Sequence, residues 1–139
     1  MKKLDSVLLV DDDAITNYIN EQLIKDLSIA QEVLVATNGK EGINVIEDRC
    51  QNKKSCPELI LLDINMPVMN GFEFLEKYQQ MQLPLCPTSV VVLLTSSTNS
   101  RDVKKSEESS IADYLIKPLT ESKINTLLEK HFNGSHQQY

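Results

Sequence analysis

The 139-residue chain lacks any apolar run long enough to cross a bilayer. Its apolar stretches, such as Val90–Leu94, are far shorter than the roughly 20 residues of a transmembrane helix. The first run, Val7–Val10, is also too short for the core of a signal peptide, and three aspartates follow it. We therefore expect a cytoplasmic protein with no membrane partner.

Clusters of lysine and arginine are missing as well. The chain carries 14 basic and 20 acidic residues, which gives a net charge of −6. Because binding to nucleic acids depends on clustered cations that face phosphates, we expect no DNA partner.

Cysteine is scarce, and no C-x-x-C pair occurs. The three cysteines are Cys50, Cys56 and Cys86. This odd number without a metal-binding spacing favours buried free thiols over a disulfide or a zinc site.

The apolar residues that are present fall into five short runs rich in valine, isoleucine and leucine. They do not alternate with polar residues, as is typical of parallel strands that helices cover on both faces. The predicted strands are Val7–Val10, Val33–Ala36, Leu59–Leu62, Val90–Leu94 and Tyr114–Ile116. Helical patterns lie between them, so the sequence predicts an α/β domain with a doubly wound parallel sheet.

The helices show single apolar stripes. In the first helix the stripe consists of residues at intervals of four, and we expect it to face the sheet; it comprises Ile15, Ile19, Leu23 and Leu27. Asp13 is the predicted N-cap of this helix, and Asn38 with Glu41 resembles a capping box for the second helix. Residues 1–132 are expected to form one domain, with residues 133–139 as a flexible tail and no second, output domain.

Candidate site residues follow four of the five predicted strands, whereas the second strand ends in Ala36 and Thr37, with no charge. These candidate residues are Asp11 and Asp12, Asp63, Thr95 and Ser96, and Lys117. In open parallel sheets, ligands bind at the carboxyl ends of the strands. A strand order of 2-1-3-4-5 would bring all four ends together and leave the uncharged second strand at one edge.

Three carboxylates that lie together repel one another, and each raises the pKa of the others. A hard divalent cation relieves that repulsion, and Mg²⁺ (or Mn²⁺) prefers such oxygen ligands. A lysine and a hydroxyl beside it suit a phosphoryl group, and Asp63 is the candidate nucleophile because an aspartate can form an acyl phosphate. The residues therefore predict a site where a metal ion assists phosphoryl transfer to a carboxylate.

The segments "LLVDDD", "LLDINMPVMNG", "LLTSS" and "YLIKP", in this order, resemble the receiver domain of bacterial two-component response regulators. The resemblance covers about residues 7 to 132. It implies a flavodoxin-like (βα)5 fold with the order 2-1-3-4-5. It also implies a stand-alone receiver that takes part in phosphorelay signalling and is not an enzyme beyond slow self-phosphorylation and dephosphorylation.

The resemblance also assigns roles to residues of the site. Asp63 is the implied acceptor of a phosphoryl group from a sensor histidine kinase or a histidine phosphotransfer protein. Asp11, Asp12, Asp63 and the backbone carbonyl of Asn65 are the implied metal ligands. Thr95 and Lys117 are expected to contact phosphoryl oxygens.

A second set of implied residues concerns the switch. Tyr114 matches the aromatic residue that turns inward when Thr95 moves toward the phosphate, and the Lys117–Pro118 peptide bond is expected to be cis. The output surface would comprise a polar fourth helix near residues 100–109, the fifth strand and the fifth helix. It would bind an unknown target, and the protein would be a monomer or a weak phosphorylation-dependent dimer.

Three other functions compete with this interpretation. A pseudo-receiver would bind partners without phosphorylation. A magnesium-dependent phosphatase of the haloacid dehalogenase type would also use an aspartate nucleophile, but Asn65 stands where those enzymes carry a second aspartate. A flavin carrier would place a hydroxyl-rich loop after the first strand, where this chain has aspartates.

Overall fold

The structure is a computed structural model that describes residues 3–51, 56–66, 68–81, 89–96, 101, 104–105 and 111–133. The side chains of Cys50 and Gln51 are not among the described parts. Its strands are β1 (Leu4–Val10), β2 (Ala30–Ala36), β3 (Leu59–Leu62), β4 (Val90–Thr95) and β5 (Asp113–Ile116). Its helices are α1 (Ala14–Asp26), α2 (Gly39–Gln51), α3 (Gly71–Gln80), α5 (Glu121–Leu128) and the π-helical turn η1 (Glu129–Asn133).

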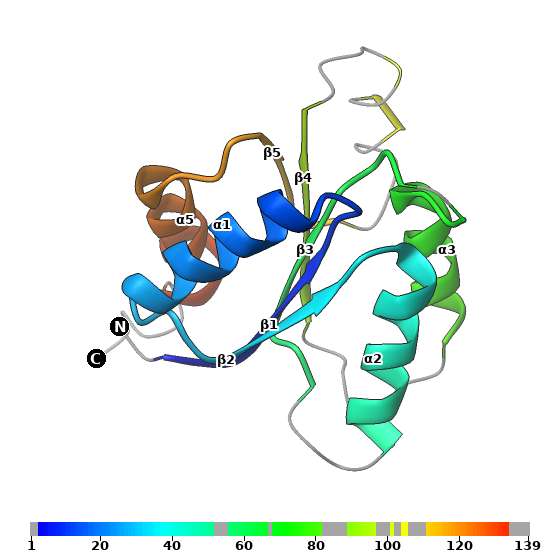
Figure 1. The fold of residues 1–139 in the computed structure, drawn as a ribbon, viewed down its shortest axis with the longest axis horizontal. Coiled ribbons are helices and arrows are strands. Elements are labelled where there is room, and N and C mark those ends of the chain that lie inside the picture. The colour runs from blue at the N-terminus through cyan, green and yellow to red at the C-terminus, as the bar shows by residue number, and fades with distance from the viewer. Residues whose placement is uncertain are drawn as a thin grey trace.

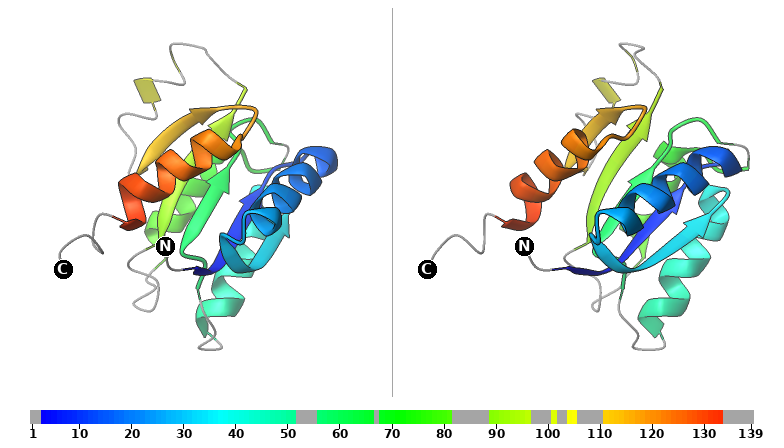
Figure 2. Two further views of the ribbon diagram at one scale, coloured as in Figure 1. Left: turned by 90° about the vertical axis from the view of Figure 1, so that its left-hand side faces the viewer. Right: turned by 60° about the vertical axis from the view of Figure 1, so that its left-hand side comes forward.

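The five strands form one parallel sheet in the order β2-β1-β3-β4-β5, which confirms the predicted order. Helices α1 and α5 cover one face of the sheet, and α2 and α3 cover the other (Figure 1). Figure 2 views the sheet from the side that carries α1 and α5. In the described part of the chain, no helix is both long and apolar enough to cross a membrane.

Two of the strands are clearly longer than predicted at their N-terminal ends, whereas β3 and β4 begin at the predicted residues. β1 begins at Leu4 and β2 at Ala30, three residues before the expected starts in both cases. The added parts contain polar residues, such as Gln31 and Glu32 in β2, which are exposed. An edge strand such as β2 can keep polar residues on its solvent side, so its apolar run marks only part of it.

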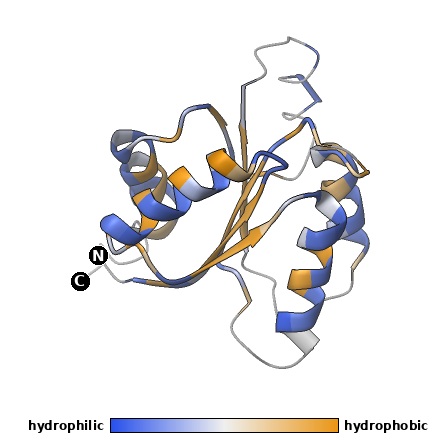
Figure 3. Ribbon diagram, viewed as in Figure 1, coloured by the Kyte–Doolittle hydropathy of each residue, from blue (hydrophilic) through white to orange (hydrophobic). Residues whose placement is uncertain are grey.

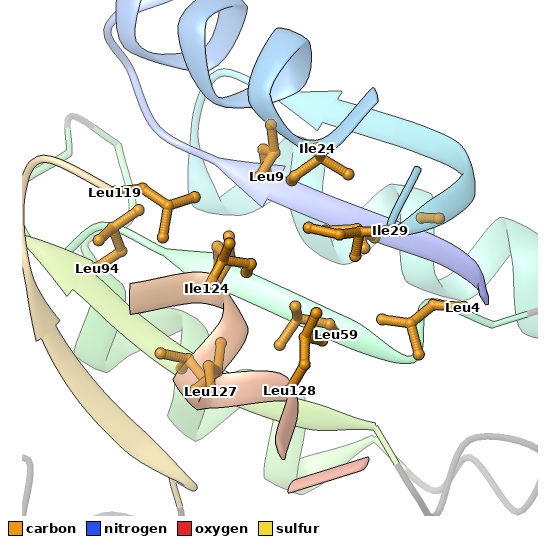
Figure 4. Close-up of a cluster of buried hydrophobic side chains, with 14 residues drawn as sticks. Leu4, Leu9, Ile24, Ile29, Leu59, Leu94, Leu119, Ile124, Leu127 and Leu128 are labelled. Atoms are coloured by element: carbon orange, nitrogen blue, oxygen red, sulfur yellow. The ribbon is translucent and has the colours of Figure 1, made fainter. Parts of the chain in front are cut away.

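Two apolar clusters fill the space between the sheet and the helices, one on each face. The first contains Phe74 of α3 and Ile46 of α2, both almost fully buried. The second joins the sheet to α1 and α5 and contains Ile24 and Ile124 (Figure 4). Hydropathy follows the same arrangement, since the central strands are the most hydrophobic elements (Figure 3).

The predicted apolar stripe of α1 is wrong for its first two residues, whereas Leu23 and Leu27 are partly buried against the core. Ile15 and Ile19 are 70% and 57% exposed, whereas Asn17, Asn20 and Ile24 are buried. Residues at intervals of three or four lie on one face of a helix. Two series in α1 have this spacing: the predicted stripe, and the series Asn17, Asn20 and Ile24, which faces the sheet. The observed rotation turns the amides toward the sheet.

The helix caps agree with the sequence in part. Asp13 is the N-cap of α1, and its carboxylate accepts hydrogen bonds from the backbone N–H groups of Ile15 and Thr16. Asn38 accepts from the Glu41 N–H, but the Glu41 carboxylate accepts from Thr37 instead of Asn38, so the predicted capping box is incomplete. A complete capping box occurs at α3, between Asn70 and Glu73.

The prediction of three free thiols is also wrong, because Cys56 is disulfide-bonded. Its bonding partner lies outside the described side chains. An odd cysteine count and the absence of C-x-x-C do not exclude a pair, since spacing along the chain does not report distance in the fold. The predicted fourth helix near residues 100–109 also lies mostly outside the described residues. Within it, Arg101, Lys104 and Lys105 are helical.

Candidate phosphoacceptor site

The parallel sheet brings the predicted site residues to one edge. Asp11 follows β1 directly, Asp63 follows β3, Thr95 ends β4 and Lys117 follows β5. Backbone hydrogen bonds fix these strand ends: the Asp63 N–H donates to the Val10 carbonyl at 2.9 Å, and the Lys117 N–H donates to the Thr95 carbonyl at 2.8 Å. The four strand ends therefore meet in space, as the order 2-1-3-4-5 requires.

Three carboxylates form the centre of the site. Ligand oxygens of Asp11, Asp12 and Asp63 all lie within 4.8 Å of one another. Asp11 and Asp63 are 5% and 6% exposed, whereas Asp12 is exposed. Hard cations bind such clusters of oxygen ligands, so the donor set and its open side fit a divalent metal ion.

Lys117 joins the two buried carboxylates. Its Nζ lies 2.6 Å from Oδ2 of Asp11 and 3.4 Å from Oδ2 of Asp63. Burial lowers the pKa of Lys117, but hydrogen bonding to Asp11 and the charge of Asp63 outweigh burial and raise its pKa. The amine therefore stays protonated and provides the positive charge that an anionic group bound at Asp63 would need.

Burial raises the pKa of Asp63, and the charge of Asp11 raises it further. Lys117 and a hydrogen bond with the Thr95 side chain lower this pKa but do not cancel the rise. Thr95 is fully buried, so its hydroxyl is held against the acceptor. A carboxylate with a raised pKa is more basic, and a cation bound beside it would favour its charged form.

The remaining predicted residues surround this centre. Asn65 lies exposed in the loop between β3 and α3, and Tyr114 lies half-buried on β5 against the α2/α3 side of the core. The Lys117–Pro118 peptide bond is cis. Pro118 also lines a cavity of about 120 Å³ between α1 and the loop after β5, together with Ile19.

Sequence reasoning missed Asn17 and Asn20, which line a small cavity next to Asp11 and Asp63. The signal was present in their spacing. They lie three residues apart and share a helix face with Ile24, which is the face that packs on the sheet.

The loop after Asp63 depends on Gly71. A Cβ atom added to Gly71 would lie 2.5 Å from the carbonyl oxygen of Asp63 and 2.9 Å from Cα of Ile64. The Gly71 N–H also donates to the Ile64 carbonyl at 2.8 Å. We expect Gly71→Ala to lower the free energy of unfolding by about 1–3 kcal/mol, because backbone atoms must move. It should also slow phosphorylation of Asp63 from acetyl phosphate, which intact mass spectrometry can follow.

Gly42→Ala is the matched control. Its Cβ would meet side-chain atoms of Phe74 at 3.0 Å and Val10 at 3.2 Å, not the acceptor loop. Alanine in a helix interior also makes the folded state about 0.5–1 kcal/mol more stable than glycine does. A smaller stability change and wild-type phosphorylation are expected for Gly42→Ala. Equal behaviour of the two variants would show that the acceptor loop tolerates the added methyl group.

The raised pKa of Asp63 predicts how stability depends on pH in EDTA. The folded protein binds this proton more tightly than the unfolded chain, in which the pKa is near 3.8. Asp63 therefore contributes its full stabilisation at pH values below the unfolded-state pKa. This contribution is lost as the pH rises through the higher pKa of the folded state. We expect the unfolding free energy of wild type to fall relative to that of Asp63→Asn as the pH rises above about 4.

Urea denaturation of both proteins across this range measures the difference. Titrating groups that do not interact with Asp63, such as Asp113 with its lowered pKa, cancel in the comparison. Mg²⁺ should stabilise wild type more than the variant, because a ligand of the folded state adds to stability. A difference that does not change with pH would contradict the expectation.

Comparisons with known proteins agree with the fold. Residues 7–129 match the family model described as response regulator receiver domain. The chain therefore belongs to the response regulator receiver family.

A solved structure of a two-component response regulator from Cytophaga hutchinsonii is 38% identical, with a TM-score of 0.85 over 95% of this chain and 99% of the other. Two-component response regulator 24 from Arabidopsis thaliana is 32% identical over 125 residues, which make up 90% of this chain and 82% of the relative. The Mn²⁺-bound form of response regulator Rcp1 is 25% identical, with a TM-score of 0.69 over 97% of this chain and 96% of the other. Several other relatives are longer, and this chain spans about half of their length or less.

Proposed function

We propose that this chain is a phosphoacceptor switch of two-component signalling in which Asp63 receives the phosphoryl group. The observation that carries the proposal is the convergence of Asp63 with Asp11, Asp12 and Lys117 at one edge of the sheet. The donor is a phosphohistidine on a sensor histidine kinase or a histidine phosphotransfer protein. A carboxylate oxygen of Asp63 attacks phosphorus, the bond from phosphorus to the histidine nitrogen breaks, and an acyl phosphate forms.

The other residues of the site prepare Asp63 for this step. Asp11, Asp12, Asp63 and the backbone carbonyl of Asn65 would hold Mg²⁺ or Mn²⁺, which supplies positive charge to the phosphoryl oxygens. Lys117, now paired with the two buried carboxylates, is placed to pair with one phosphoryl oxygen. The Thr95 hydroxyl is placed to donate a hydrogen bond to another.

The output follows from the added charge. An aspartyl phosphate draws Thr95 and Lys117 toward it, and Tyr114 turns inward into the space that Thr95 leaves. The surface of the fourth helix, β5 and α5 then changes its affinity for a target protein. We place this switch in the cytoplasm, with residues 1–132 as the receiver; residues 134–139 of the expected tail lie outside the described residues. In this proposal the chain acts as a switch and not as a turnover enzyme.

The experiment is intact mass spectrometry of the purified protein after incubation with acetyl phosphate, with Mg²⁺ or with EDTA. A single phosphoryl adduct that requires the metal supports the proposal. No adduct under either condition would favour the pseudo-receiver, which binds partners without phosphorylation. Membership of the receiver family favours the phosphoacceptor switch over the phosphatase and the flavin carrier.

The exposed face of α1 is the approach for the protein donor. Ile15, Tyr18 and Ile19 are each more than half exposed, and Ile19 shares a cavity with Lys117. A phosphohistidine that reaches Asp63 has to pass this rim, and exposed apolar side chains there suit a protein surface. We expect Ile15→Ser to slow transfer from a phosphorylated histidine phosphotransfer protein at least about fivefold. This change corresponds to a loss of about 1 kcal/mol of binding free energy between the two proteins. Phosphorylation from acetyl phosphate should be unchanged, and an equal loss with both donors would contradict this role.

A further inference from the structure

The amides of α1 that face the sheet are costly where they lie. Asn17 and Asn20 are 3% and 6% exposed, while Ile15 and Ile19 on the same helix face solvent. A buried amide without full hydrogen bonding is unfavourable, and so is an exposed isoleucine. Buried amides beside exposed isoleucines are expected where the amides have a functional role.

Asn17 holds the backbone between two of the site aspartates. Its Nδ2 donates a hydrogen bond of 2.8 Å to the backbone carbonyl of Asp11. That carbonyl belongs to the peptide unit joining Asp11 to Asp12, so its orientation sets the directions of both carboxylates. On the other side, the Asp13 N–H donates to the Asp11 carboxylate at 2.9 Å. The loop is thus fixed from two directions.

The second polar atom of Asn17 is buried and has no hydrogen-bond partner among the residues that the structure describes. This atom, Oδ1, belongs to a side chain that lines a cavity of about 10 Å³ next to Asp11, Asn20 and Asp63. A cavity needs about 10–15 Å³ to hold one water molecule, and a buried water needs two or more polar partners. The cavity volume lies at the lower end of this range, and polar residues such as Asp11, Asn20 and Asp63 line it.

We propose that Asn17 is a positioning residue that fixes the Asp11–Asp12 peptide unit from beneath, so that both carboxylates are preoriented for a divalent cation. This inference rests on the proposed metal-dependent function. Groups that orient metal ligands typically contribute 10–100-fold to metal affinity. Asn17 does not touch the phosphoryl group, so its effect reaches the chemistry only through the metal ligands.

The test compares Asn17→Leu with Asn20→Leu. Each variant replaces one buried amide on the same helix face by a side chain of similar size. Only the first removes a hydrogen bond to Asp11, since within the described chain the structure shows no hydrogen bond from Asn20 to that loop. The Mg²⁺ dissociation constant is measured by titration with Mg²⁺ alone, followed by backbone amide NMR shifts.

For Asn17→Leu we expect the Mg²⁺ dissociation constant to rise about tenfold or more. Phosphorylation from acetyl phosphate should slow at low Mg²⁺ and recover to within about twofold of wild type at saturating Mg²⁺. Asn20→Leu should change the dissociation constant by less than about threefold. If Asn17→Leu does not fold, Asn17→Ser replaces it, with the same direction expected.

Wild-type affinity in Asn17→Leu, or an equal loss in Asn20→Leu, would overturn the inference, since a general packing role would then suffice. Failure of the proposed function is distinguishable from this outcome. If the proposed metal-dependent function is wrong, the wild-type protein itself does not bind Mg²⁺. The outcomes for the variants, in contrast, are read against a wild type that binds it.

Discussion

Asp63→Asn is expected to abolish the phosphoryl adduct that acetyl phosphate forms on the wild-type protein in the presence of Mg²⁺. The amide of asparagine is a poor nucleophile and carries no charge, so it cannot form the acyl phosphate. The loss should be complete within the detection of intact mass spectrometry. The fold should survive, because the change removes a charge that burial and Asp11 disfavour.

Asp113→Asn is the matched control. Asp113 is a partly buried aspartate at the start of β5, where it pairs with Lys130 and His131. It lies at the opposite end of the strand from Lys117, so this variant should be phosphorylated as wild type is. An adduct that persists in Asp63→Asn would mean that another side chain is the acceptor. Peptide mapping would then identify it, with Asp11 and Asp12 as the nearest candidates.

Ile24→Ala is expected to lower the free energy of unfolding by about 2–5 kcal/mol, and Ile15→Ala by less than about 0.5 kcal/mol. Both residues are isoleucines of α1. Ile24 is fully buried in the cluster between α1, α5 and the sheet, whereas Ile15 is 70% exposed (Figure 4). Removing buried methyl groups loses transfer free energy and leaves a cavity, and neither cost applies at an exposed position.

Urea denaturation of the two variants beside wild type measures both values under one set of conditions. The stripe deduced from spacing alone would predict the opposite ranking, because it places Ile15 against the sheet. Similar losses for the two variants would mean that α1 is rotated from the orientation in the structure. The same result would weaken the role given to Asn17, since that role depends on this rotation.

The sequence by itself determined the sheet and the composition of the site. Runs such as Leu59–Leu62 are apolar at every position, which only a strand covered on both faces requires. A charge placed directly after such a run must lie at a strand end, and parallel strands bring their carboxyl ends to one edge. The order of residues along the chain therefore predicts that Asp11, Asp63 and Lys117 share one site.

Only the tertiary structure decided which face of α1 is buried and which groups lie beneath the site. Spacing along a helix defines its faces, but the free energy of packing against the sheet chooses between them, and here it favours Asn17 and Ile24 over Ile15. The close approach of Gly71 to the Asp63 carbonyl also depends on two segments meeting in space. Local sequence carries the preferences of each element, whereas contacts between distant elements fix their rotation, and in this chain that rotation places an amide beneath the acidic loop.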